Sequence, residues 1–158
     1  MSRILKGGAA AALVLATPLL AYYEGYFPQA YSDPVGIPTI CYGHTEGVTL
    51  NERLDTQTCK ALLTRDAMMA LDAVNACIHV DLEPWEAGAL VSFTYNVGGA
   101  ALCSSTMAKL ANAGAPAAQW CQQMTRWTHA VKFGVTIELP GLVKRRAAET
   151  KMCLGEVT

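Results

Sequence analysis

A run of seventeen residues without a charge, residues 7–23, ends directly at Glu24. Such a run is cleaved as an export signal, placed in a membrane, or retained as a helix that leads into Glu24. As a helix it would reach about 26 Å at 1.5 Å per residue, which barely spans a bilayer. Arg3 and Lys6 precede it, and this charge asymmetry is typical of an N-terminal export segment with a cytoplasmic N-terminus.

Cleavage after Ala21 is the ordinary outcome for an export segment, but the sequence disfavours it. Leu19 would then occupy the third position back, where a small residue is preferred. Glu24 would become the third residue of the mature chain, and a frayed terminus does not hold a functional side chain in place. We therefore expect residues 1–23 to be retained as an anchor segment and residues 24–158 to form one domain.

Glu24 and Asp33 are two carboxylates in contrasting settings. Glu24 ends the apolar run, which favours a raised pKa and an available proton, whereas Asp33 lies in a polar turn where water keeps it ionised. Carboxyl pairs of this kind break glycosidic bonds: one protonates the leaving oxygen, and the other helps a water attack or stabilises the developing positive charge. The nine-residue spacing alone is weak evidence, because many surfaces carry such a pair.

The residues around this pair are more specific. Glu24, Asp33 and Thr39 resemble the Glu, eight residues, Asp, five residues, Thr pattern of the phage-type lysozymes, the endolysins of glycoside hydrolase family 24. The likeness covers about residues 22–158 and includes three segments in the family's order: TICYGHT (39–45), SFTYNVG (92–98) and PGLVKRRAAE (140–149).

The resemblance implies an α+β lysozyme fold, mostly helical, in which a small β lobe and a larger helical lobe flank a cleft and an N-terminal anchor helix is appended. It implies hydrolysis of the β-1,4 bond between N-acetylmuramic acid and N-acetylglucosamine in peptidoglycan, which causes host lysis. Glu24 would be the general acid, Asp33 the base or electrostatic partner, and Thr39 the residue that positions water. Inversion is expected and needs about 6.5–9.5 Å between the carboxyls.

Four more side chains carry expectations. In the family, a histidine at the position of His44 pairs with an acidic residue on the following helix, and Asp66 is the candidate. Asn96 is expected to line the cleft. Trp127 is a candidate sugar-binding residue, although an indole in a small helical lobe is usually part of the core.

The net charge of the chain and the spacing of its histidines bear on two kinds of ligand, nucleic acids and metal ions. The net charge of -1 and the single basic cluster at residues 144–146 argue against a nucleic-acid partner. That cluster is expected to form structural ion pairs on a helix with Glu149. A zinc site is not expected, since no CxxC pair or histidine-containing ligand spacing occurs. The hydrolysis that the resemblance implies needs no metal or organic cofactor.

Six cysteines form an even set, which predicts disulfides and an oxidising compartment, here a bacterial periplasm. Fifteen pairings are formally open, and buried free thiols are the alternative. Pairing of sequential neighbours is preferred because each bond would join consecutive elements: Cys41 with Cys59, Cys77 with Cys103, and Cys121 with Cys153. Cys41 also departs from the family motif, which more commonly has glycine there.

Periodicity predicts short strands followed by helices. Glycines and prolines among apolar residues predict two or three strands in residues 30–45. Apolar spacings of three and four predict a long helix over residues 56–78. Further helices are expected over 84–97, from Ser104 or Ser105 to near Gly114, from Pro116 to include Trp127, and after Pro140 and Gly141 through Cys153.

The apolar segment also resembles the signal-anchor-release sequence of some phage endolysins. This implies a monomer held in the host inner membrane through residues 7–23, with its catalytic domain in the periplasm, and later released in soluble form. Two alternatives stay open: a lytic transglycosylase that uses the same glutamate and forms an anhydro sugar, and a non-catalytic, membrane-anchored protein that binds the cell wall.

Overall fold

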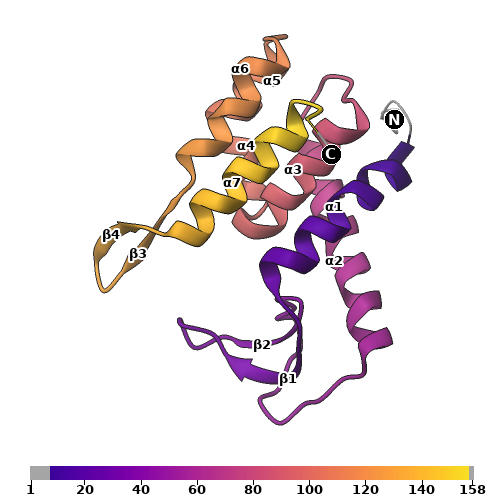
Figure 1. The fold of residues 1–158 in the computed structure, drawn as a ribbon, viewed down its shortest axis with the longest axis vertical. Helices are drawn as coiled ribbons and strands as arrows, with labels where there is room; N and C mark the ends of the chain where they lie inside the picture. The colour runs from indigo at the N-terminus through magenta and orange to yellow at the C-terminus, as the bar shows by residue number, and fades with distance from the viewer. Residues whose placement is uncertain (1–7, 157–158) are drawn as a thin grey trace.

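The computed structural model describes residues 8–156 and has a small β lobe below a larger helical lobe (Figure 1). The β lobe contains the antiparallel strands β1 (Phe27–Ser32) and β2 (Pro38–Cys41). The mostly helical α+β arrangement expected from the sequence is confirmed. The helical lobe contains α3 (Pro84–Val97), α4 (Gly99–Ser104), α5 (Thr106–Asn112), α6 (Ala117–Cys121), the 3₁₀ helix η1 (Gln122–Arg126) and α7 (Pro140–Cys153).

Two helices connect the lobes. α1 (Gly8–Glu24) leads down into β1, and α2 (Thr56–Cys77) returns from the β lobe to pack against α3. The predicted long helix over residues 56–78 is therefore confirmed. The side chain of Asp55 begins α2 by accepting a hydrogen bond of 2.8 Å from the Thr58 amide, which satisfies a donor that the first turn of a helix leaves free.

α3 is the centre of the core. Its residues 87–94 are buried on every side, as expected for a helix enclosed by others rather than one that faces water. α1, α2 and α7 all pack against it. Glu83 and Glu86 form a capping box at its start, with Pro84 in the first turn.

α1 belongs to this core. Ala12, Ala16 and Leu20, spaced four residues apart, are fully buried on one face, whereas Val14 on the other face is 71% exposed. Gly88 of α3 allows the close approach, because a Cβ there would lie 3.1 Å from both the Ala12 carbonyl oxygen and the Leu15 Cβ. α1 thus completes the helical lobe.

Within residues 8–156, no helix is both long enough and apolar enough to cross a membrane. The basic residues Arg3 and Lys6, which suggested an export segment, lie outside the described residues. The expected boundary between an anchor and a catalytic domain falls at the last residues of α1 and stays a prediction.

Three disulfides join successive parts of the chain, and their pairing is the one expected. Cys41–Cys59 ties β2 to α2, Cys77–Cys103 ties the end of α2 to α4, and Cys121–Cys153 ties α6 to α7. Each bond closes a loop of 18 to 32 residues, which limits the conformational freedom of the unfolded chain.

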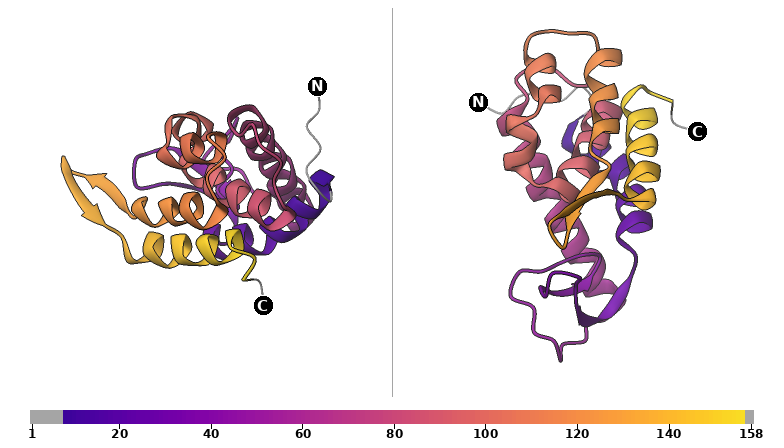
Figure 2. Two further views of the ribbon diagram at one scale, coloured as in Figure 1. Left: turned by 90° about the horizontal axis from the view of Figure 1, so that it is seen from above. Right: turned by 90° about the vertical axis from the view of Figure 1, so that its left-hand side faces the viewer.

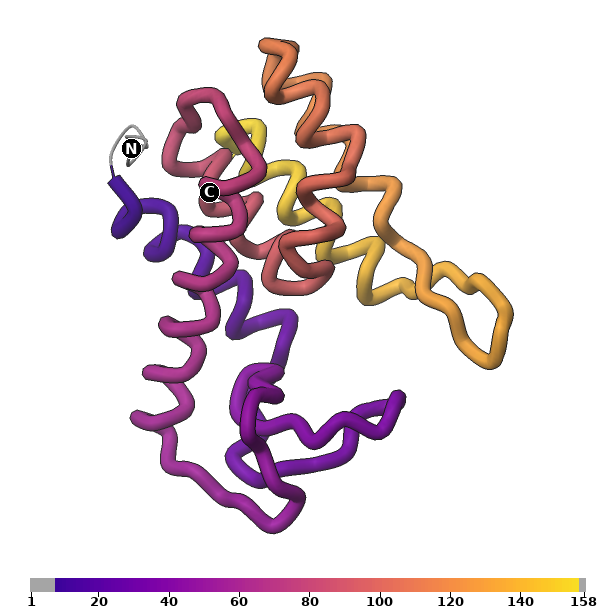
Figure 3. Tube along the Cα trace, turned by 180° about the vertical axis from the view of Figure 1, so that it is seen from behind, coloured from indigo at the N-terminus to yellow at the C-terminus, as the bar shows by residue number. Residues whose placement is uncertain are grey.

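A second hairpin was not predicted. β3 (His129–Lys132) pairs in antiparallel register with β4 (Val135–Glu138) and extends from the helical lobe (Figure 2). The tube view from behind shows the turn between β1 and β2 projecting toward the same side as this hairpin (Figure 3). β3 and β4 have only four residues each, and the side chains at the tip of their hairpin are exposed. Their apolar pattern therefore gives no sign of a buried face.

Candidate active site

Glu24 is the last residue of α1, and a cation and a glycine enclose its carboxylate. Oε1 accepts a hydrogen bond of 2.6 Å from Nη1 of Arg145. Oε2 points toward Gly43, where an added Cβ would lie only 3.0 Å away. The apolar surroundings expected for Glu24 are therefore wrong: its side chain is 18% exposed and ion-paired, because α7 brings Arg145 against the end of α1.

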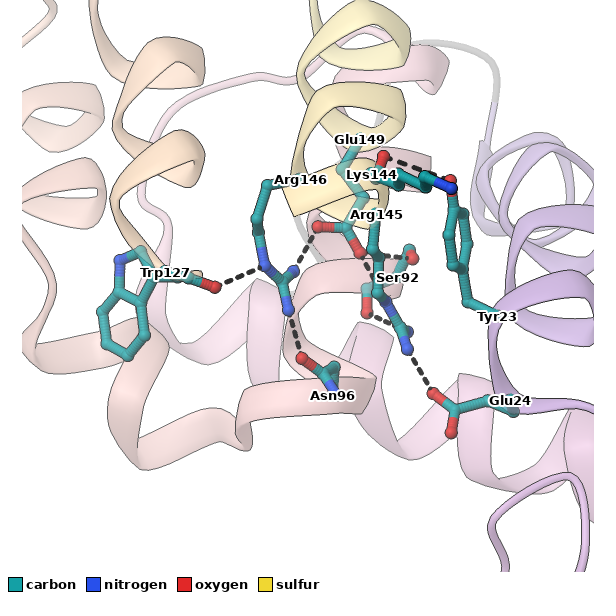
Figure 4. A network of polar contacts seen from close by, with 9 residues as sticks. All are labelled: Tyr23, Glu24, Ser92, Asn96, Trp127, Lys144, Arg145, Arg146 and Glu149. Carbon is teal, nitrogen blue, oxygen red and sulfur yellow. Dashed lines mark hydrogen bonds and ion pairs between the residues drawn. The ribbon is translucent and has the colours of Figure 1, made fainter. Parts of the chain in front are cut away.

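Arg145 belongs to a buried network of charges on α7 (Figure 4). Its Nε donates to Oε1 of Glu149 over 3.0 Å, and its Nη2 donates to the Ser92 carbonyl oxygen over 3.0 Å. Glu149 also accepts hydrogen bonds from the Ser92 hydroxyl and from Arg146. With Glu24, the cluster has two cations and two carboxylates, so its formal charge is zero, which is how buried ions are tolerated.

The surroundings of the two arginines shift their pKa values in opposite directions. Burial lowers the Arg145 pKa, but the nearby Glu24 and Glu149 carboxylates outweigh burial and raise it above its ordinary value. For Arg146, burial dominates over the attraction of Glu149 and lowers the pKa. The guanidinium that holds Glu24 is thus the more firmly charged of the two.

Asp33 lies in the turn between β1 and β2. Its Oδ1 accepts hydrogen bonds from the amides of Val35 and Ile37, at 2.9 and 2.8 Å, and these bonds fix the side chain relative to the turn. Thr39 follows in β2, is buried, and donates its hydroxyl hydrogen to the Ile37 carbonyl oxygen over 3.0 Å. The Thr39 oxygen can still accept a hydrogen bond, for example from water.

Tyr31 lies in β1, between Glu24 and Asp33 in the sequence. It pairs with Thr39 across the β1–β2 ladder. Burial raises the pKa of its hydroxyl, and the negative charges of Glu24 and then Asp33 raise it further. The charges of both carboxylates therefore act on one hydroxyl, although Glu24 ends α1 and Asp33 lies in the β1–β2 turn.

A pocket of about 370 Å³ lies on the α2 and α3 side of Gly43, and none of Glu24, Asp33 and Thr39 lines it. It is shared by both lobes, since residues 43–46 of the β lobe, residues 66–73 of α2 and the end of α3 contribute to its lining. Gly43 belongs to this lining and also faces Glu24. The expected structural pair is present at its wall, where Nδ1 of His44 and Oδ2 of Asp66 are 2.7 Å apart.

Tyr95 helps to close the inner wall of this pocket. Its hydroxyl donates to the Tyr42 carbonyl oxygen over 2.7 Å, which connects α3 to the β lobe. Burial, together with the charges of Asp66 and Glu24, raises the Tyr95 pKa, so this hydroxyl remains a hydrogen-bond donor.

The structure places Asn96 and Trp127 at opposite ends of Arg146. Arg146 donates through Nη2 to Oδ1 of Asn96 and through Nε to the Trp127 carbonyl oxygen. Asn96 is exposed, and its bond to Arg146 uses the amide oxygen rather than the amide nitrogen. The Trp127 ring packs edge-on against Phe93, with 5.4 Å between ring centroids, yet it also lines a second pocket of about 410 Å³ in the helical lobe.

Comparison with known proteins adds an independent observation. The sequence pattern of the phage lysozyme family matches residues 21–149. The chain belongs to this family. A SAR-endolysin of Pseudomonas phage phiKMV is 37% identical over 155 residues, which cover 98% of this chain and 93% of the relative.

Two solved structures resemble this phage lysozyme closely. The muramidase domain of SpmX from Asticaccaulis excentricus has a TM-score of 0.83 and 32% identity, and covers 96% of this chain and 99% of its own. An endolysin from Escherichia coli O157:H7 phage FAHEc1 has a TM-score of 0.83 and 30% identity, covering 99% and 98%. The expected lysozyme fold is confirmed.

Three features of this phage lysozyme escaped the sequence interpretation. Arg145 was expected only to pair within its own helix, and it also holds Glu24. Gly43 and Tyr31 were considered only as part of the strand pattern, although Gly43 faces Glu24 and the charges of both carboxylates act on the Tyr31 hydroxyl. The RR pair and the glycine of the YGH motif were visible signals, but the partner of each lies in a distant segment of the chain.

Cys41, the residue that departs from the motif described above, has a left-handed backbone with φ of 61°. Glycine adopts this conformation without steric cost, whereas a residue with a Cβ does not. Here the side chain is fully buried and bonded to Cys59 of α2. The disulfide and the burial of the side chain offset the cost of this backbone conformation. The disulfide also ties β2, which carries Thr39, to α2.

Proposed function

We propose that the chain is an endolysin that hydrolyses the β-1,4 bond between N-acetylmuramic acid and N-acetylglucosamine in peptidoglycan. Glu24 is the general acid, Asp33 the base or electrostatic partner, and Thr39 the residue that positions the attacking water. The single observation that carries the proposal is the position of Glu24: Arg145 fixes this carboxylate at the end of α1, and it faces Gly43, which lines a pocket shared by both lobes.

The geometry divides the two oxygens of Glu24 between two tasks. Arg145 occupies Oε1, so the transferable proton resides on Oε2, which faces Gly43. The missing side chain at Gly43 leaves room for the glycosidic oxygen to approach this proton. Arg145 fixes the carboxyl in position, and proton donation needs such fixation because it requires hydrogen-bond distance from the leaving oxygen.

Asp33 and Thr39 suit the opposite face of the sugar. The two amide hydrogen bonds fix Oδ1 against the turn, and Oδ2 is left to accept a hydrogen bond from water. A water that donates one hydrogen to Asp33 and the other to the Thr39 oxygen would be oriented for attack. This arrangement favours hydrolysis over formation of an anhydro sugar, which needs no ordered water.

Asn96, Trp127, His44 and Asp66 complete the assignment. Arg146 orients the Asn96 amide so that its nitrogen can donate to a sugar or peptide oxygen, and Trp127 borders the second pocket. The His44–Asp66 pair keeps the loop after β2 against α2 and serves structure rather than catalysis. The enzyme acts as a monomer on peptidoglycan.

The N-terminal segment has two successive roles in this proposal. Residues 7–23 first hold the chain in the host inner membrane, with the remainder in the periplasm, as the names of the SAR-endolysin relatives suggest. After release, residues 8–23 of this segment fold together with Glu24 as α1, whose buried face completes the core. The active site is therefore incomplete until the segment leaves the bilayer.

Glu24→Gln tests the proposal. The variant keeps the shape and the contact with Arg145 but removes the proton, so release of soluble fragments from purified sacculi should fall by more than about 100-fold. Glu52→Gln, an equivalent change elsewhere in the β lobe, should retain the wild-type rate. Release of fragments by Glu24→Gln at the wild-type rate would rule out catalysis by this carboxyl.

Product analysis separates the remaining alternatives. Mass spectrometry of the fragments should show a reducing N-acetylmuramic acid end, whereas an anhydro end would indicate a transglycosylase. Wall binding without any released fragment would indicate a non-catalytic protein. The anomer of the new reducing end decides between inversion and retention.

A further inference from the structure

The β3–β4 hairpin presents apolar side chains to solvent at its tip. Phe133 is 97% exposed, Val131 is 72% exposed and Val135 is 60% exposed. Single exposed apolar residues are ordinary on protein surfaces, but here three lie within five residues on one projecting element. Figure 2 shows that element standing away from the helices of its own lobe.

The turn at the tip is poorly suited to its own sequence. Lys132 pairs with Val135, so the loop has two residues, Phe133 and Gly134, with φ of 51° and 76°. Positive φ at both positions is the geometry in which Asn-Gly is favoured, and a bulky aromatic residue is sterically disfavoured there. Phe133 gains almost no burial in exchange, so its presence indicates a contact outside the chain.

The base of the hairpin is connected to the candidate active site. The Thr128 hydroxyl donates to Oε1 of Glu138 over 3.0 Å, and the Leu139 amide donates to the Thr128 carbonyl oxygen over 2.8 Å. The preceding residue, Trp127, is held by Arg146, the same side chain that orients Asn96. The hairpin therefore continues the wall of the helical lobe that carries the proposed sugar contacts.

The length of the β3–β4 hairpin is suited to contact with a long polymer. Four paired residues at about 3.3 Å each place the tip about 13 Å from the base. The β1–β2 turn that carries Asp33 projects toward the same side of the molecule (Figure 3), and its Val35 is 77% exposed. A continuous strand that leaves the cleft on this side of the molecule would pass beside the tip.

We propose that the β3–β4 hairpin is a distal binding site for the glycan strand of peptidoglycan, in which the Phe133 ring stacks on a sugar face outside the cleft. The inference rests on the proposed function, since it assumes the same substrate. Aromatic rings are suited to this contact because they offer a large apolar face at little conformational cost. The hairpin then gives the enzyme a preference for intact wall over short soluble fragments.

Phe133→Asn is the direct test, because Asn-Gly fits the turn and the fold should be as stable as wild type or more so. The value of kcat/KM on purified sacculi should fall about tenfold, the effect of one lost aromatic contact. On a soluble wall hexasaccharide the rate should change by less than about twofold. Leu50→Asn, which removes an exposed apolar side chain from another loop, controls for a general loss of surface apolarity.

Binding without cleavage gives a second measurement. In a Glu24→Gln background, co-sedimentation with sacculi should weaken when Phe133→Asn is added. An unchanged rate and unchanged binding on sacculi would overturn the proposal, as would equal losses on sacculi and hexasaccharide. Failure of the proposed function is distinguishable, because wild type would then release no fragments while the binding comparison could still be made.

A lipid surface is the competing occupant of the hairpin. Sedimentation of wild type and Phe133→Asn with vesicles of mixed anionic and zwitterionic phospholipid measures it directly. Phenylalanine-dependent binding to vesicles, together with unchanged hydrolysis of sacculi, would assign the hairpin to a membrane and overturn the glycan contact.

Discussion

Glu149 is the carboxylate whose removal should most strongly destabilise the protein. Its side chain is fully buried, and it accepts hydrogen bonds from the Ser92 hydroxyl, from Nε of Arg145 and from Nη1 of Arg146. Glu149→Gln preserves the volume but removes the negative charge between two buried guanidinium groups. It also replaces one accepting oxygen with a donating NH₂ group that faces other donors.

The size of the effect follows from this loss of compensation. Removing one partner of a buried ion pair costs about 3–5 kcal/mol. At about 2.1 cal/mol/K of unfolding entropy per residue, the 158-residue chain has an unfolding entropy of about 0.33 kcal/mol/K. Dividing the free-energy loss by this entropy predicts a Tm about 9–15 °C below that of wild type.

Thermal unfolding under non-reducing conditions, followed by circular dichroism, measures this shift while the disulfides stay intact. Glu46→Gln is the matched control, because Glu46 also pairs with an arginine, Arg65, but their side chains are 73% and 51% exposed. An exposed pair contributes at most about 1 kcal/mol, so this variant should shift Tm by less than about 3 °C. Two equal shifts would refute the claim that burial makes the α7 cluster dependent on Glu149.

Other variants test the rest of the structure. Gly43→Ala should lower kcat/KM on sacculi by about 10- to 100-fold because its Cβ would displace the carboxylate that ends α1, whereas Gly114→Ala, with the same φ of 78° and open space, should affect only stability. Ala16→Asp should lower the free energy of unfolding by more than about 3 kcal/mol, because it places an unpaired charge in the core. Val14→Asp, on the exposed face of α1, should leave the free energy of unfolding of the released enzyme nearly unchanged. Chemical denaturation measures both values, and equal values for the two variants would exclude α1 from the core. Hydrogen bonding to the first turn of α2 lowers the Asp55 pKa below 3.8, so Asp55→Ala should reduce Tm at neutral pH, and the difference should disappear as the pH falls through the lowered pKa; a difference that persists in acid would contradict this account.

Local patterns in the chain were sufficient for most of the helices. The apolar spacing of α2, the Pro84 start and Gly98 end of α3, and the Ser105 cap of α5 are properties of neighbouring residues, and each predicted element was confirmed. The order of the cysteines also favoured the observed disulfides, since sequential elements pack against each other here. These features need no knowledge of distant contacts.

Contacts between distant segments decided the environment of the site. Glu24 follows an apolar run in sequence, yet α7 returns 121 residues later to place Arg145 against it. The β3–β4 hairpin likewise has no buried apolar face that periodicity could reveal. A residue's neighbours along the chain predict its secondary structure, but the charges that surround its side chain depend on how helices pack, and packing joins residues whose separation in sequence has no fixed relation to their distance in space.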